Sequence, residues 1–148
     1  MSEIGPEAAK LQAALIDLGF AMEGEQIVKD GHRADLVAKR GGEAYVVEVK
    51  IQVPFRRTQF LGAIAHGILQ LRDLKQSEPA RRPLLAVWVE KGKPNAAREF
   101  ESYVQHHAPE IDWLIVDASG GRKWKIGGDQ GEGAGEGRVS IQPPNSAP

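Results

Sequence analysis

The chain has 148 residues, no cysteine and a formal net charge of −1. This length suits one domain with a buried core, and the lack of cysteine excludes disulfides, thiolate catalysis and cysteine-ligated zinc. No run approaches the roughly 20 apolar residues of a membrane span, and no signal peptide opens the chain. We therefore expect a soluble, cytoplasmic protein with no membrane partner.

The predicted elements begin with a helix, because Gly5 and Pro6 form a helix start and Gly19 ends the apolar stripe. The run at 84–89 is continuously apolar and follows a helical crossover, so we expect a buried strand parallel to an earlier one. In chain order we expect a helix over 6–18, strands over 25–29, 33–38 and 43–51, a helix over 56–76, a strand over 84–89, a helix over 95–106, a strand over 113–116 and a short edge strand over 122–126. The order α-β-β-β-α-β-α-β predicts an α/β fold.

The last part of the chain differs in composition. Glycine, proline and polar residues dominate 127–148, and no apolar periodicity is visible there. We expect one domain over 1–126 and a disordered tail over 127–148.

Two charged residues interrupt an apolar strand. In the run 43–51, side chains alternate between faces, so Glu48 and Lys50 point the same way while Val47, Val49 and Ile51 are expected in a core. Burying an unpaired charge is costly, so such a pair is usually a site or a salt-linked rim. The alternative is that Glu48 and Lys50 form a solvated cross-strand pair on an edge strand, with no functional role.

A second carboxylate is expected close to this pair. Asp35 opens the preceding apolar segment, and the turn at 39–42 folds that segment back as a hairpin. Asp35 would then lie on the neighbouring strand, near Glu48. Two carboxylates and the backbone carbonyl of Val49 suit Mg²⁺ or Mn²⁺, which prefers oxygen ligands, and Lys50 could orient or deprotonate an attacking water.

The arrangement of Asp35, Glu48 and Lys50 resembles the PD-(D/E)xK nuclease superfamily. This resemblance implies a restriction-endonuclease-like three-layer sandwich, in which helices flank a central mixed β-sheet. In length and layout the chain looks most like small members such as the element-excision controlling-factor (XisH-like) group and the junction resolvases. Many members also carry a glutamate on the first helix and a glutamine on the crossover helix, for which Glu7 and Gln70 are the matching supporting residues.

Basic residues surround the predicted site. Residues 29–82 contain eleven Lys/Arg and six Asp/Glu, and phosphate contacts supply most non-specific affinity for nucleic acid. Arg33 is two residues before Asp35, so in a strand both side chains are expected on the same face. Arg56 and Arg57 begin the crossover helix, where the helix dipole favours an anion. These three arginines are the candidate DNA contacts.

The predicted function is a metal-dependent DNA endonuclease in which water attacks the phosphodiester directly. The alternative is a non-catalytic subunit with a nuclease fold that binds DNA or a partner protein. A third reading is a structural domain unrelated to nucleic acid. A homodimer or a partner protein is expected, because one small domain offers little recognition beyond the phosphate backbone.

Overall fold

The structure, a computed structural model, describes residues 5–24, 28–29, 32–33, 36–52, 56–90 and 94–133. Seven strands form one mixed sheet in the order β1-β4-β5-β6-β7-β8-β9. They are β1 (Ala21–Gly24), β4 (Leu36–Arg40), β5 (Glu43–Gln52), β6 (Arg82–Val89), β7 (Asp112–Asp117), β8 (Arg122–Ile126) and β9 (Asp129–Gly133). Two further strands, β2 (Val28–Lys29) and β3 (His32–Arg33), pair with each other in a separate small sheet.

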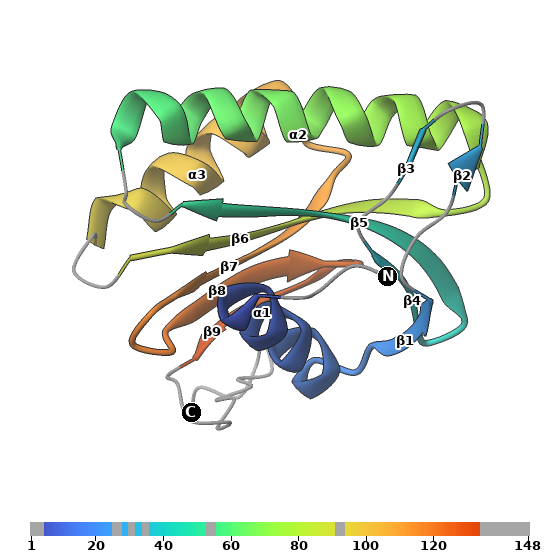
Figure 1. The fold of residues 1–148 in the computed structure, drawn as a ribbon, viewed down its shortest axis with the longest axis horizontal. Coiled ribbons are helices and arrows are strands. Elements are labelled where there is room, and N and C mark those ends of the chain that lie inside the picture. Colours follow the sequence, from blue (N-terminus) through green and yellow to red (C-terminus); the bar gives the residue numbers. More distant parts are fainter. Residues whose placement is uncertain are drawn as a thin grey trace.

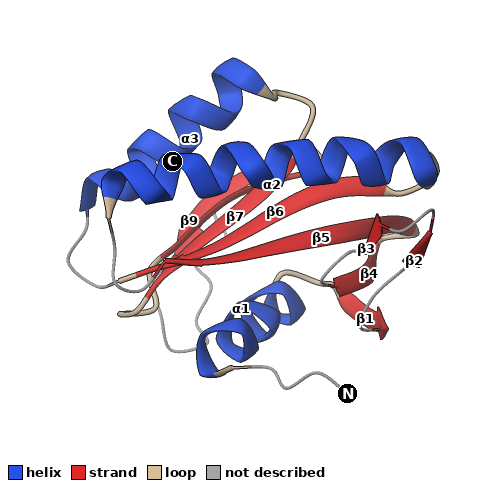
Figure 2. Ribbon diagram, turned by 45° about the horizontal axis from the view of Figure 1, so that its top comes forward, coloured by secondary structure: helices blue, strands red, loops and turns tan. Residues whose placement is uncertain are grey.

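Helices cover both faces of the large sheet. The helices α2 (Arg57–Ser77) and α3 (Pro94–His107) lie on one face, and α1 (Pro6–Asp17) lies on the other (Figures 1 and 2). The chain is therefore a three-layer α/β sandwich, as the sequence predicted. Within the part of the chain that the structure describes, no helix combines the length and apolarity that a membrane span needs.

The middle of the sheet is parallel and its flanks are antiparallel. β5, β6 and β7 run parallel, while β4 pairs with β5 and β8 with β7 in antiparallel register. The hairpin between β4 and β5 turns through Gly41 and Gly42, whose φ angles are 57° and 85°. Two positive φ angles are what a tight two-residue hairpin turn needs, so glycine suits both positions. This turn confirms the predicted hairpin.

Two apolar cores result from this layering. One contains Phe60, Ile64 and Leu71 of α2, packed with Val46, Leu85 and Val87 of the sheet. The other contains Leu11 and Leu15 of α1, packed with Val47, Leu84 and Ala86. Alternate residues of β5 and β6 thus enter opposite cores, which explains why β6 is apolar without interruption.

The first strand differs from the sequence prediction. We expected a strand over 25–29, of which 28–29 form β2 and 25–27 lie outside the described residues, but the large sheet begins earlier, with β1 at Ala21–Gly24. β1 is an edge strand whose Met22 is only partly buried, so it needs few β-branched residues and gives a weak sequence signal. The strand expected over 33–38 corresponds to two strands, β3 and β4.

The sheet also continues past the predicted start of the tail. Residues 129–133 form β9, which pairs with β8 in register from Arg122↔Gly133 to Ile126↔Asp129. A Cβ atom added to Gly131 would lie 2.6 Å from a ring carbon of Trp124, so glycine lets β9 pass directly against this buried ring. The glycine content that suggested disorder is therefore partly a packing requirement. Residues 134–148 lie outside the described residues.

A chain that ends at Ile126 should be less stable than a chain that ends at Gly133. The shorter chain loses β9 and exposes the Trp124 ring, and uncovering a large apolar side chain costs about 2 kcal/mol. The chain that ends at Gly133 keeps every strand described above. Urea unfolding of the two proteins measures the difference. Equal stabilities would show that β9 contributes nothing.

A buried polar network joins the amino-terminal ends of β5, β6 and β7. Asp112 of β7 is 2% exposed and accepts hydrogen bonds from Arg82 Nη2 of β6 at 3.2 Å and from the Gly127 N–H at 3.0 Å. Burial, together with the negative charge of Asp112, raises the pKa of Tyr45 in β5. Burial alone would lower the pKa of Arg82, but the nearby Asp112, Tyr45 and Glu43 together more than offset this effect and raise it. The network therefore connects three adjacent strands and the β8–β9 turn.

Candidate functional site

The candidate site lies on β5, on the face covered by α2. The residue before it on the same face, Val46, belongs to the α2 core, so alternation along the strand puts Glu48 and Lys50 under this helix too. Glu48 is 4% exposed, which is rare for a carboxylate. The solvated edge-strand alternative is therefore wrong, because β5 is a central strand and Glu48 is in the interior.

Lys50 makes defined contacts with both neighbouring elements. Its Nζ donates a hydrogen bond to Oε1 of Gln70 on α2 at 2.8 Å and lies 3.7 Å from Oε2 of Glu48. The lysine stem runs beneath Gly67, one helical turn before Gln70. A carboxylate, an ammonium and an amide from two elements therefore meet between the sheet and α2.

Within the described residues, β5 has a strand on both sides only as far as Val47. The first residue of β4, Leu36, pairs with Val47, the residue before Glu48. In the described part of the chain, β5 continues beyond that pair to Gln52 along β6 alone. Glu48 and Lys50 thus lie toward the carboxyl ends of the parallel strands, the edge of an α/β sheet where binding crevices commonly form.

The apolar residues of this strand differ in part from the prediction. Val47 is fully buried, as expected, and Val49 is partly buried against the α1 core. Ile51 was expected in the core but is 37% exposed. Alternation puts Ile51 on the face of Val47 and Val49, but it does not reveal how completely that face is covered near the end of β5.

Two predicted residues cannot be compared with the geometry. Asp35 lies outside the described residues, and Arg33 is described only through its backbone, in β3 opposite Val28. Among the described residues, no group of three or more His, Asp or Glu is placed to hold a metal ion. Asp35 is not among these described residues.

Three other predicted residues, Glu7, Arg56 and Arg57, lie on helices outside the contacts of Lys50. Glu7 is in the first turn of α1, a helix that packs on the opposite face of the sheet, so the described structure does not place it with Lys50. Arg56 is exposed at the N-cap of α2. Arg57 is also exposed, but its Nε lies 2.9 Å from Oε2 of Glu99 on α3. The roles of these residues stay predictions.

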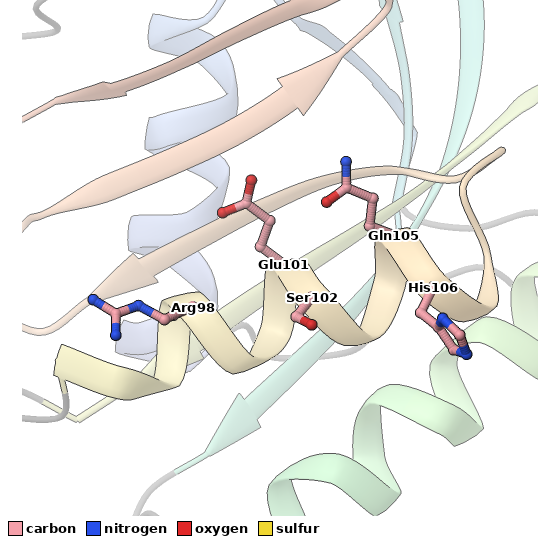
Figure 3. Close-up of a pocket in the computed structure, with 5 residues that line it drawn as sticks. All are labelled: Arg98, Glu101, Ser102, Gln105 and His106. Carbon is pink, nitrogen blue, oxygen red and sulfur yellow. The ribbon is translucent and has the colours of Figure 1, made fainter.

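A separate pocket lies on α3, away from Lys50. It is lined by Arg98, Glu101, Ser102, Gln105 and His106, has a volume of about 420 Å³ and is shown in Figure 3. The carboxylate of Glu101 lies 2.6 Å from Nζ of Lys123, so the one acid in this pocket is already in an ion pair. The pocket brings no pair of carboxylates together and is a weaker candidate than the β5 site.

In sequence, the chain matches no protein-family model and no curated protein. In structure, it resembles an XisH family protein from Nostoc punctiforme PCC 73102. The TM-score is 0.52 at 23% identity, over 72% of this chain and 87% of that chain. It also resembles an FdxN element excision controlling factor protein from Anabaena variabilis. Here the TM-score is 0.51 at 21% identity, over 75% of this chain and 89% of that chain.

At these identities the likeness concerns the fold. The XisH-like layout expected from the sequence therefore agrees with the solved structures that resemble this chain. The comparison does not assign a role to any residue of the candidate site.

One residue of the site was missed by the sequence analysis. A Cβ atom added to Gly67 of α2 would lie 2.9 Å from Cδ1 of Leu85 and 3.3 Å from Cε of Lys50. A glycine on the buried face of an amphipathic helix was the available signal, because such a glycine usually has a packing reason.

Proposed function

We propose that this protein is a metal-dependent DNA endonuclease that hydrolyses a phosphodiester bond by direct attack of water. The observation that carries the proposal is the pairing of Glu48 and Lys50 in the interior, with Gln70 on Lys50 Nζ. A strand that only filled a core would have apolar residues at both positions, because burying charges is costly. Keeping an acid and a base together here favours a chemical role.

The donor chemistry of this site fits Mg²⁺ or Mn²⁺. Carboxylate and carbonyl oxygens are the ligands that these ions prefer, and Mg²⁺ often needs only one or two carboxylates from the protein. Glu48, the Val49 carbonyl and Asp35 are the proposed ligands. Asp35 is bonded to Leu36, whose partner in the sheet is Val47, so the proposal requires its carboxylate to reach the adjacent Glu48. When bound, the ion would polarise the phosphate and make water a better nucleophile.

The protein's own residues have separate tasks in this proposal. Lys50 orients the attacking water and offsets the negative charge that develops on the phosphate. The new P–O bond forms to the water oxygen, which gives up a proton, while the opposite P–O bond of the backbone breaks and the leaving oxygen takes up one proton, so the proton count is unchanged. Gln70 holds Lys50 through its amide oxygen. Glu7, the supporting acid expected from the resemblance, has no task in this proposal, because α1 packs on the opposite face of the sheet from Lys50.

The proposed substrate contacts are Arg33, Arg56 and Arg57. Arg56 suits this role best, because it is exposed at the N-terminus of α2, where the helix dipole favours a phosphate. Arg57 would first have to leave Glu99, and an exposed ion pair of this kind is worth only about 1 kcal/mol or less. DNA is the proposed partner, with a second copy or a partner protein adding recognition.

A second candidate function is a non-catalytic subunit that binds DNA or a partner protein. It is favoured by one observation, the similarity in fold to a protein named as an excision controlling factor. Under this alternative, Glu48 and Lys50 would serve binding or stability only.

Cleavage of DNA decides between the two. We expect the purified protein to nick or linearise plasmid DNA with Mg²⁺ or Mn²⁺ and to be inactive with EDTA. The substrates should include supercoiled plasmid, single strands and branched junctions, with Glu48→Ala as the inactive control. If metal-loaded protein binds these DNAs tightly but never cuts them, the proposal fails and the accessory function takes its place.

A further inference from the structure

We infer that Gly67 is a positioning residue of the proposed site, because its missing side chain leaves the slot in which Lys50 reaches Gln70. The inference rests on the proposed function for the role of Lys50, but the geometry of the slot stands independently of it. Gly67 does not contact the reacting atoms and acts only through Lys50.

The slot is enclosed by the sheet on one side and by α2 on the other. Leu85 of β6 is the register partner of Glu48, and it occupies the space next to the lysine stem. Gly67 lies above both, and a Cβ atom there would come within 2.9 Å of Leu85 Cδ1 and 3.3 Å of Lys50 Cε. Real side chains do not tolerate the first contact and rarely the second. Any residue larger than glycine must therefore displace Leu85, Lys50 or the helix.

The slot fixes a side chain that is otherwise flexible. Lysine has a long stem with several rotatable bonds, and ordering it in one rotamer costs conformational entropy. Here the stem is enclosed between helix and sheet, while Nζ is held by Gln70 Oε1 at 2.8 Å. Gly67 and Gln70 are three residues apart and so lie on one face of α2. The helix thus supplies both the space for the stem and the acceptor for the ammonium.

The same helix offers a matched control. Gly62 is exposed, and a Cβ atom added there would meet nothing within 4 Å. Both glycines are inside α2, so a change to alanine improves helix propensity equally at either position. Any difference between Gly62→Ala and Gly67→Ala therefore measures the effect of filling the slot.

The experiment compares four proteins: the parent, Gly62→Ala, Gly67→Ala and Gly67→Ala/Leu85→Val. We expect Gly62→Ala to raise the melting temperature by roughly 3 °C and to leave cleavage unchanged. Gly67→Ala should not show this rise, and its kcat should fall by about tenfold to a hundredfold, because small displacements of a catalytic group have large effects. Its affinity for Mg²⁺ should match the parent.

NMR gives a readout that does not depend on cleavage. In the parent we expect nuclear Overhauser contacts between the Lys50 ε-methylene and the Gln70 side-chain amide, and in Gly67→Ala we expect them to be lost. In the double variant, Leu85→Val removes the closer clash, so the melting temperature should recover while the Lys50–Gln70 contact stays absent. The double variant also keeps the test available if Gly67→Ala alone fails to fold.

Two results would overturn the inference. One is a Lys50–Gln70 contact that persists in Gly67→Ala, and the other is a double variant in which both this contact and kcat return to the parental values. Either would make Gly67 a packing residue against Leu85 only. If the parent never cleaves DNA, the proposed function fails, and the NMR contact alone decides whether Gly67 positions Lys50.

Discussion

Replacing Lys50 by methionine should reduce DNA cleavage by about 10²-fold to 10⁴-fold, the range that a positioned acid–base group contributes. Methionine keeps a stem of similar length in the slot, so the loss should reflect the missing ammonium rather than a cavity. Affinity for Mg²⁺ should stay equal or rise, because Nζ of Lys50 lies only 3.7 Å from Oε2 of Glu48. Removing a positive charge beside a proposed metal ligand lowers the repulsion felt by the cation.

Glu48→Gln should also abolish DNA cleavage, but through weaker binding of Mg²⁺. This change removes a proposed ligand charge, so we expect Mg²⁺ affinity to fall by about tenfold or more, which corresponds to about 1.4 kcal/mol. Cleavage should be lost with it. Without metal, Glu48→Gln should lower stability, because it leaves the mostly buried Lys50 ammonium without its counter-charge, although Lys50 keeps its hydrogen bond to Gln70.

The two variants are compared by calorimetric titration with Mg²⁺ and by plasmid nicking. Lys39→Met is the matched control, since Lys39 is an exposed lysine on the adjacent strand β4 whose Nζ pairs with Glu23 at 3.3 Å. We expect Lys39→Met to behave as the parent in both measurements. The assigned roles are wrong if Lys50→Met loses metal as severely as Glu48→Gln, or if either variant cuts at the parental rate.

The largest loss of stability is expected from Asp112→Ala, at about 3 kcal/mol. Asp112 is buried, and its removal leaves the Gly127 N–H without its acceptor and Arg82 without its counter-charge. The value is at the lower end of the range for a broken buried pair, because the Arg82 side chain is 38% exposed and can be partly hydrated. Cleavage at low temperature should persist, since this network lies at the other end of the strands from Lys50.

Asp129→Ala is the control for this prediction. Asp129 also accepts from an arginine, Arg40, at 3.0 Å, but its side chain is 67% exposed. An exposed pair contributes at most about 1 kcal/mol, so Asp129→Ala should unfold at nearly the parental urea concentration. Equal effects of the two substitutions would show that burial of Asp112 carries no special weight.

The sequence was sufficient where a local rule decides the outcome. Strand alternation placed Glu48 and Lys50 on one face of β5, and two glycines in succession predicted the tight hairpin at Gly41 and Gly42. The helical period similarly predicted α2, with Phe60, Ile64 and Leu71 toward the core. Each of these features depends on residues within one or two turns or strands of each other.

Errors arose where a segment contributes little apolar surface. β1 and β9 are edge strands that pair through their backbones, so their side chains gave little signal, and glycine in β9 suggested disorder. Ile51 was expected in the core because alternation says which face a residue points to but not where the covering helix ends. In these cases the deciding contact comes from another element, a neighbouring strand for β1 and β9 and the covering layer for Ile51.

The sequence by itself determined the α/β order and the shared face of Glu48 and Lys50, because periodicity and turn chemistry are local properties, while the three-layer class was implied by the family resemblance. Only the tertiary structure decided that Lys50 lies beneath α2 with Gln70 as its acceptor, that Gly67 leaves room for its stem, and that Asp112 joins Arg82 and Gly127. These contacts connect residues 15 to 30 positions apart in the sequence. Their geometry depends on how closely helix and sheet pack, which no local pattern of residues specifies.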